Sequence, residues 1–197
     1  MIYLNDHIDS LDIEESLALV SKQRRQEALR YRQINGQRQS LAVYLLLCEA
    51  LEKEYGIVER PEFSFGEHGK PFLADHADIH FNFSHCRRAV LCVVDSVPVG
   101  CDIEAVPEKL DMDLCRCCFN DEEVDAIISS PSPTIAFTEL WTRKEAFLKL
   151  TGEGLTDNLP AVLAAPLAQK ASFSTHISPD HSYVYTICKR GRKLTKC

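Results

Sequence analysis

The chain has 197 residues, 45% of them hydrophobic and 26% charged, and its formal net charge at pH 7 is −7. This composition fits a globular protein of one domain or two small ones, and the acidity argues against a nucleic-acid-binding protein. The sequence offers neither a run of about 20 apolar residues for a membrane span nor a signal peptide, so we expect a cytoplasmic protein that contacts no membrane.

Helices are predicted first along the chain. Apolar spacing indicates a helix over residues 11–34 that stops at Asn35-Gly36. A clearer pattern, with apolar residues at i, i+3, i+4 and i+7, runs from Leu41 to Tyr55, and Gly56 ends it.

The first of these segments is also basic. Between residues 22 and 38 the only acid is Glu27, against Lys22, Arg24, Arg25, Arg30, Arg32 and Arg38. A basic stretch in an acidic protein indicates a local anion site, although a solvated helix face would have the same composition.

Strands follow in the middle of the chain. A short candidate at 63–65 precedes a turn-rich loop at 66–71. Further strands are predicted at 79–83, 89–95 and 99–106, and the short link before the last of them is compatible with a hairpin.

The second half repeats this order of helices and then strands. Helices are predicted at 112–118, at 121–128 with Asn120 or Asp121 as N-cap, and at 137–150, followed by strands at 172–177 and 183–188. Because strands and helices do not alternate regularly, the pattern favours an α+β fold with antiparallel sheets over a doubly wound parallel sheet.

The nine cysteines are interpreted as reduced thiols, several of them buried, because their number is odd and the sequence does not indicate secretion. A zinc knuckle at Cys115-Arg-Cys-Cys118 is the alternative, but no second Cys/His pair follows it at a suitable spacing.

Two acidic residues lie two positions apart on one predicted strand. Because side chains alternate along a strand, Asp102 and Glu104 share a face, and because residues four apart share a helix face, Trp141, Glu145 and Lys149 line up. Together they offer three carboxylates and an ammonium group, a set that suits Mg²⁺ and phosphate oxygens. The alternatives are a solvent-facing strand edge and an ordinary surface ion pair between Glu145 and Lys149.

Five segments in order resemble the signature motifs of the 4′-phosphopantetheinyl transferases of the longer, single-chain, pseudo-dimeric type. They are Gly69-Lys-Pro71, Phe81-Asn-Phe-Ser-His-Cys86, Val99-Gly-Cys-Asp-Ile-Glu104, Phe119-Asn-Asp-Glu-Glu123 and Trp141-Thr-Arg-Lys-Glu-Ala-Phe-Leu-Lys149. The resemblance implies two similar subdomains, 1–100 and 101–197, that are related by a pseudo-twofold axis, with the site between them. It also implies transfer of 4′-phosphopantetheine from coenzyme A to a serine of an acyl or peptidyl carrier protein, with release of 3′,5′-ADP.

The resemblance also assigns roles to individual residues. Glu145 and Lys149 would be catalytic, with Glu145 as general base for the serine, either directly or through a bound water. Ligands of Mg²⁺ would be Asp102, Glu104 and Glu145. Coenzyme A would be bound by Arg38, Lys70, Ser84, His85 and Lys144, although another basic residue of 24–38 could replace Arg38. Without the motif, His85 would be read as a structural hydrogen-bonding residue, and Glu123 is either an accessory acid or a first-turn acid of its helix.

Two other functions stay open at this point. A Mg²⁺-dependent nucleotide pyrophosphohydrolase could use the same carboxylates with water in place of serine. A non-catalytic module that binds coenzyme A or a carrier protein is the other candidate, and the intact carboxylates argue against it.

Overall fold

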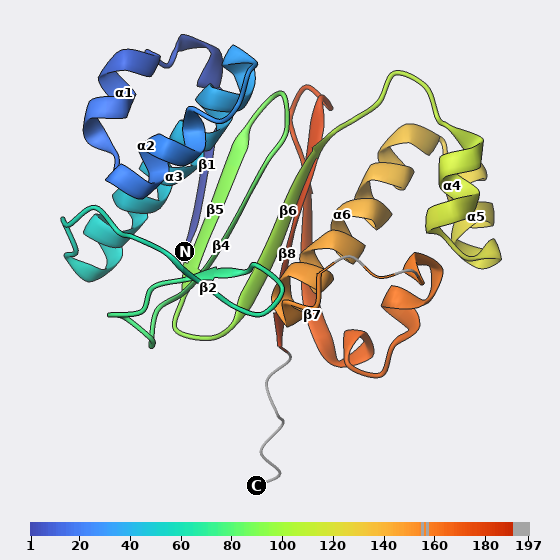
Figure 1. The fold of residues 1–197 in the computed structure, drawn as a ribbon. Helices are drawn as coiled ribbons and strands as arrows, with labels where there is room; N and C mark the ends of the chain where they lie inside the picture. Colours follow the sequence, from blue (N-terminus) through green and yellow to red (C-terminus); the bar gives the residue numbers. More distant parts are fainter. Residues whose placement is uncertain (155, 157, 191–197) are drawn as a thin grey trace, which may run out of the picture.

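Two three-stranded antiparallel sheets, each covered by one long helix, form the frame of the protein (Figure 1). The structure is a computed structural model that describes residues 1–154, 156 and 158–190. The elements outside these two sheets and two long helices are η1 (Ile8–Ser10), α1 (Ile13–Leu19), α2 (Lys22–Ala28), β2 (Ser64–Phe65), β3 (Pro71–Phe72), α4 (Met112–Cys118), α5 (Asp121–Ile128), η2 (Leu159–Ala164) and η3 (Ala168–Lys170).

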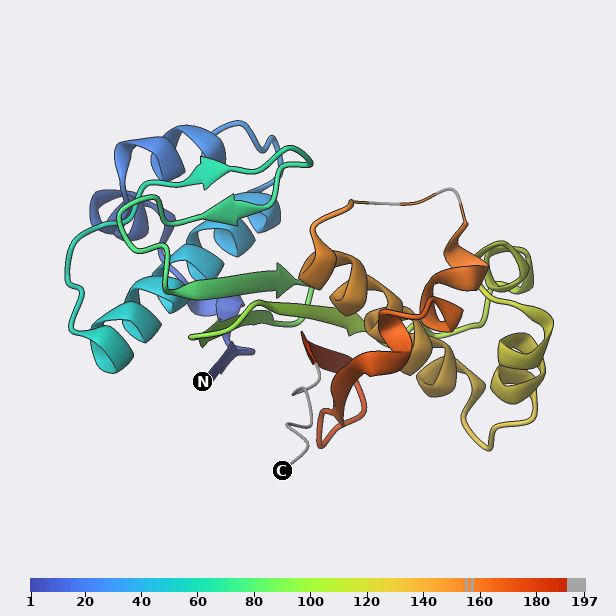
Figure 2. The same ribbon diagram turned by 90° about the horizontal axis from the view of Figure 1, so that it is seen from below.

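The two halves of the chain have the same connectivity. The first consists of β1 (Ile2–Asn5), α3 (Ile34–Tyr55), β4 (His80–His85) and β5 (Val90–Asp95), with sheet order β1-β5-β4. The second consists of β6 (Val99–Ala105), α6 (Pro133–Thr151), β7 (Ala171–Ile177) and β8 (Tyr183–Arg190), with sheet order β6-β8-β7. In each half a strand and a long helix precede two strands, and the last strand lies in the middle of its sheet. Figure 2 shows the two helix-covered halves side by side.

Strand β6 belongs to the second half and lies against strands β4 and β5 of the first. Its odd-numbered residues Val99, Cys101 and Ile103 pack with Leu91 and Val93 of β5 in one buried cluster. The even-numbered residues face α6, and at Gly100 the helix is so close that an added Cβ would lie 2.1 Å from the carbonyl oxygen of Ala146. The alternation expected for a half-buried strand therefore directs the acidic residues of β6 toward α6.

Most of the predicted elements are confirmed. The strands at 79–83, 89–95, 99–106, 172–177 and 183–188 and the helices of the second half are all present, with ends shifted by a few residues. The side chain of Asn120 caps α5 in a capping box with Glu123. Gly56 and Gly152 end α3 and α6 in the left-handed conformation that glycine adopts without strain.

The single helix predicted over 11–34 is wrong. Two short helices form instead, because the side chain of Asp12 caps α1 and that of Ser21 starts a new helix, α2. Helix α3 then begins at Ile34, so Asn35-Gly36 lies in its first turn.

The hairpin suggested at 95–98 is also wrong. Strand β5 pairs with β1 and β4, whereas β6 pairs with β8, so this short link carries the chain from one sheet to the other. The sequence pattern also missed β1. Within the described residues, no helix has both the length and the apolar character needed to cross a bilayer.

Candidate active site

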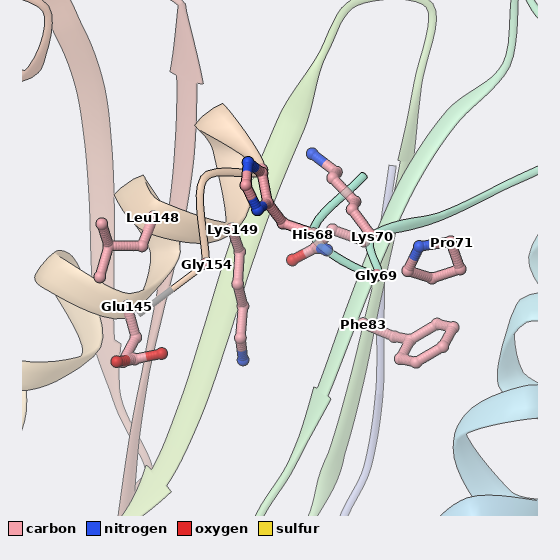
Figure 3. Close-up of a pocket in the computed structure, with 11 residues that line it drawn as sticks. His68, Gly69, Lys70, Pro71, Phe83, Glu145, Leu148, Lys149 and Gly154 are labelled. Atoms are coloured by element: carbon pink, nitrogen blue, oxygen red, sulfur yellow. The ribbon is translucent and has the colours of Figure 1, made fainter. Parts of the chain in front are cut away.

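A groove runs between β4, β6 and α6. It consists of two adjoining hollows of about 370 and 280 Å³ that share Phe83, Glu145 and Lys149. In Figure 3, Glu145 and Lys149 project from α6 on one side, and Phe83 and the loop at 68–71 lie on the other. The first hollow is also lined by Ser84, His85, Asp102, Glu104 and Trp141.

Asp102 lies at the centre of the groove wall and is only 2% exposed. Its Oδ1 accepts hydrogen bonds from Lys149 Nζ at 2.6 Å and from Ser84 Oγ at 2.8 Å. Lys149 Nζ also donates to Ser84 Oγ at 2.9 Å, so the three side chains form a closed triangle. Burial opposes the charged form of Lys149, but the Asp102 carboxylate and its hydrogen bond outweigh this and raise the Lys149 pKa.

The acids of the groove repel one another. Burial, followed by the Asp102 charge, raises the pKa of Glu145, and the same causes raise the pKa of Glu104 to about 7. Among the residues that the structure describes, neither Asp102 Oδ2 nor Glu145 Oε1, both buried, has a hydrogen-bond partner. Buried oxygens of this kind are costly unless a cation or a ligand satisfies them.

These features fit a divalent cation that shares its coordination with a substrate. In the described part of the chain, no group of three or more His, Cys, Asp or Glu residues is arranged to hold a metal ion on its own. Mg²⁺ does not require such a cage, since it takes one or two protein carboxylates and completes its shell with water and phosphate oxygens. The two unpartnered oxygens are donors of the required hard type.

Ser84 and His85 end strand β4 at the same hollow. The hydroxyl of Ser84 is bonded inside the groove, whereas the side chain of His85 is exposed at its rim. Partial desolvation of the ring at this rim, followed by the nearby ammonium group of Lys149, lowers the pKa of His85.

The structure places Lys70 at the second hollow, but its ammonium group bonds to backbone. Lys70 Nζ donates to the carbonyl oxygens of Val99 and Leu150, each at 3.2 Å. Burial lowers the Lys70 pKa, with a smaller opposing effect from Cys101.

The structure does not bring Arg38 to this groove. Arg38 Nε donates to the Leu11 carbonyl at 3.3 Å, and the side chain lines a separate hollow beside Asp12 and Glu14. The residue of the basic stretch that lies behind the groove is Arg24, which is 4% exposed and has its guanidinium 5.7 Å from the ring centroid of Phe83.

Lys144 is not a groove residue, which corrects the expectation that it binds coenzyme A. It is fully buried on the far side of α6, where Nζ donates to Glu123 at 2.6 Å and to the carbonyls of Cys118 and Leu159, each at 2.9 Å. Glu123, through its ion pair and its capping box, belongs to this structural cluster.

We therefore expect Lys144→Met to lower the free energy of unfolding by about 3 kcal/mol or more, because it leaves the Glu123 charge and two carbonyls without their donor. Urea unfolding measures the change. Lys53→Met is the matched control, since Lys53 makes an exposed ion pair with Glu49 within one helix. Equal losses in the two variants would contradict the structural role.

The sequence prediction missed Asn82. Its side-chain Oδ1 accepts a hydrogen bond from the backbone N–H of Cys101 at 2.7 Å and joins β4 to β6. The signal was available, since Asn82 is two residues before Ser84 and therefore shares its strand face.

With this geometry established, the chain can be compared with known proteins. The family model of the 4′-phosphopantetheinyl transferase superfamily matches residues 98–190. A Bacillus subtilis protein named 4′-phosphopantetheinyl transferase is 31% identical, over 95% of this chain and 89% of its own. The 4′-phosphopantetheinyl transferase Sfp of Bacillus subtilis strain 168 is 28% identical over 93% and 83%, and psf-1 of Bacillus pumilus is 31% identical over 90% and 76%. The chain belongs to the 4′-phosphopantetheinyl transferase superfamily, a family of enzymes.

Proposed function

We propose that this protein transfers 4′-phosphopantetheine from coenzyme A to a serine hydroxyl of an acyl or peptidyl carrier protein. In this reaction the serine oxygen forms a bond to the phosphorus next to pantetheine, and the bond from that phosphorus to 3′,5′-ADP breaks. The observation that carries the proposal is the groove in which Asp102, Glu104 and Glu145 surround the hydrogen-bonded ammonium group of Lys149. Family membership points to the same reaction.

The three carboxylates would hold Mg²⁺. When bound, the ion would neutralise the pyrophosphate and stabilise the charge that develops on the leaving group. Asp102 and Glu104 come from one face of β6, and Glu145 comes from the facing side of α6, so the two elements supply ligands from two directions. The proposal is supported by the two buried carboxylate oxygens that lack partners among the described residues.

Glu145 and Lys149 would act on the reacting groups. Glu145 lines the hollow beside Asp102 and Lys149 and would accept the serine proton, either directly or through one water molecule. Lys149 keeps its charge next to Asp102 and can donate to a phosphoryl oxygen from the groove floor.

The adenosine side of coenzyme A would lie against the N-terminal half. We assign the 3′-phosphate to the rim at His85 and Ser84. The positive charge that balances this phosphate would come from Arg24 and not from Arg38. Of the basic residues of 24–38, Arg24 is the one that lies behind Phe83, near His85.

We further infer that the subdomains 1–100 and 101–197 are related by a pseudo-twofold axis. The support is the shared connectivity of the two halves, each with its last strand in the centre of its sheet. The site would then combine β4 of one subdomain with β6 and α6 of the other.

Magnesium binding should depend on pH because Glu104 has a pKa of about 7. The folded protein holds this proton up to about pH 7, whereas the ordinary pKa of a glutamate is 4.5, so without metal the free energy of unfolding falls as pH rises between these values. A cation competes with the proton, and we therefore expect Mg²⁺ to raise the Tm more at pH 8 than at pH 6. Differential scanning fluorimetry tests this, and Glu104→Gln should remove the difference. Equal shifts at both pH values in the unaltered protein would contradict it.

The decisive experiment is to weigh an apo acyl carrier protein and an apo peptidyl carrier protein by mass spectrometry after incubation with coenzyme A, Mg²⁺ and this protein. We expect a gain of one phosphopantetheine. Glu145→Gln should slow the gain roughly 100-fold or more, because the base and one metal-side charge are lost. EDTA should abolish it, and Glu15→Gln, an exposed change on α1, should not affect it.

The other outcomes separate the remaining candidates. Release of 3′,5′-ADP without any gain in carrier mass would identify the pyrophosphohydrolase. Binding of coenzyme A with neither product would identify the non-catalytic module.

A further inference from the structure

The outer edge of β6 has an unusual set of partners. Strand β6 is at the edge of its sheet, and among the described strands its one pairing partner is β8. Backbone groups of alternate residues point to the same edge of a strand, so those of Val99 and Cys101 share one. On that edge the N–H of Cys101 donates to Asn82 Oδ1 at 2.7 Å, and the carbonyl of Val99 accepts from Lys70 Nζ at 3.2 Å. Two side chains of the N-terminal half thus bond the backbone of a strand in the other half.

These hydrogen bonds lie beside the groove between β4, β6 and α6. Asn82 and Ser84 are two residues apart on β4 and share a face, as their partners show: Asn82 bonds Cys101, and Ser84 bonds Asp102. The hydrogen bond between Asn82 and Cys101 therefore lies next to the hydrogen-bonded triangle of Ser84, Asp102 and Lys149. A shift of β6 by one residue would replace Asp102 with an apolar neighbour opposite Ser84.

The contact between β4 and β6 is made through a side chain. Strands that pair through their backbones lie about 4.8 Å apart. In the described residues β4 pairs with β5 and β6 with β8, and the amide side chain of Asn82 joins β4 to β6 in place of a backbone ladder.

Lys70 adds a second attachment at the end of α6. Its Nζ also donates to the Leu150 carbonyl at 3.2 Å, and an added Cβ on Gly152 would lie 3.4 Å from its Cδ. The loop of the N-terminal half is thereby attached both to the start of β6 and to the C-terminal turn of α6, the helix that carries Glu145 and Lys149.

We propose that Asn82 and Lys70 are positioning residues. Their hydrogen bonds to the outer edge of β6 keep Asp102 in register with Ser84 and Lys149. This inference rests on the proposed function for its kinetic consequence, but not for the hydrogen bonds themselves. It assigns Lys70 to the protein framework and not to a phosphate of coenzyme A.

The test compares Asn82→Leu, which removes the acceptor, with Asn82→Asp, which keeps an acceptor oxygen. In ¹⁵N-cysteine-labelled protein without substrates, we expect the Cys101 amide to exchange with solvent at least about tenfold faster in Asn82→Leu than in the unaltered protein. In Asn82→Asp the protection should be retained. An unchanged exchange rate of the Cys101 amide in Asn82→Leu would contradict the positioning role of Asn82, whether or not the protein is a transferase.

The kinetic test uses Asn82→Leu and Lys70→Met. We expect kcat for carrier modification to fall roughly 10- to 100-fold in each, because the acidic strand is displaced, while the Kd of coenzyme A from calorimetry changes by less than about threefold. Asn82→Asp should restore most of the kcat that Asn82→Leu loses. A weakened Kd with unchanged kcat in Lys70→Met would instead place its ammonium group on a coenzyme A phosphate and overturn the assignment of Lys70. Lys70→Met also keeps the proposal testable if Asn82→Leu does not fold.

Discussion

Asp102→Asn is expected to reduce phosphopantetheinyl transfer on the order of 1,000-fold while the protein stays folded. The asparagine has nearly the same shape and can still accept hydrogen bonds from Lys149 and Ser84 through its amide oxygen. It lacks the negative charge that would hold Mg²⁺, and it removes the main cause of the raised Lys149 pKa. Steady-state kinetics with an apo carrier protein measures the loss, and circular dichroism confirms the fold.

The matched control for this variant is Asp113→Asn. Asp113 is also an aspartate, but its side chain is 99% exposed and lies at the long distance of 3.9 Å from the guanidinium group of Arg116. Its rate should equal that of the unaltered protein within a factor of about two. If Asp102→Asn kept more than a tenth of the rate, Asp102 would not be a metal-side ligand.

Gly100→Ala is expected to lower the free energy of unfolding by about 3 kcal/mol or more. A Cβ at this position would lie 2.1 Å from the carbonyl oxygen of Ala146 and 2.3 Å from the backbone nitrogen of Leu150. Because these are backbone atoms of α6, no side-chain rotation can relieve the overlap, and the helix must move away from β6. Urea unfolding measures the change.

The same substitution at Gly66 provides the control. The nearest atom to a Cβ there is the Lys70 carbonyl oxygen at 3.7 Å, an ordinary contact. Gly66→Ala should therefore change stability by less than about 1 kcal/mol. Similar losses in the two variants would show that the contact between α6 and β6 is not the cause.

The arrangement within each element of the site could be predicted from the sequence. The two-residue period of a strand predicts the shared face of Asp102 and Glu104, and the four-residue spacing of a helix predicts the alignment of Glu145 with Lys149. In the structure all four line the same hollow. That β6 and α6 face each other came from the family resemblance, because a spacing rule describes one element and not its neighbours.

The errors arose where the partner of a side chain is distant in sequence. Lys144 is adjacent to Glu145, but successive residues of a helix point in different directions, and α5 and η2 cover the face that Lys144 occupies. Lys70 was expected to bind coenzyme A, and no sequence pattern indicated that its ammonium group also bonds to the carbonyls of Val99 and Leu150, which are 29 and 80 residues away. The hairpin failed for a related reason: a short link does not reveal which strands pair across it.

The pairing of Lys149 with Asp102 has a consequence for the order in which the enzyme is assembled. The most deeply buried acid of the groove has a counter-ion at 2.6 Å that the chain itself supplies. The scaffold can therefore form without metal, in contrast to small zinc domains, for which the ion supplies the folding energy. Cation and substrate would enter a finished site, and depletion of Mg²⁺ would silence the enzyme reversibly instead of unfolding it.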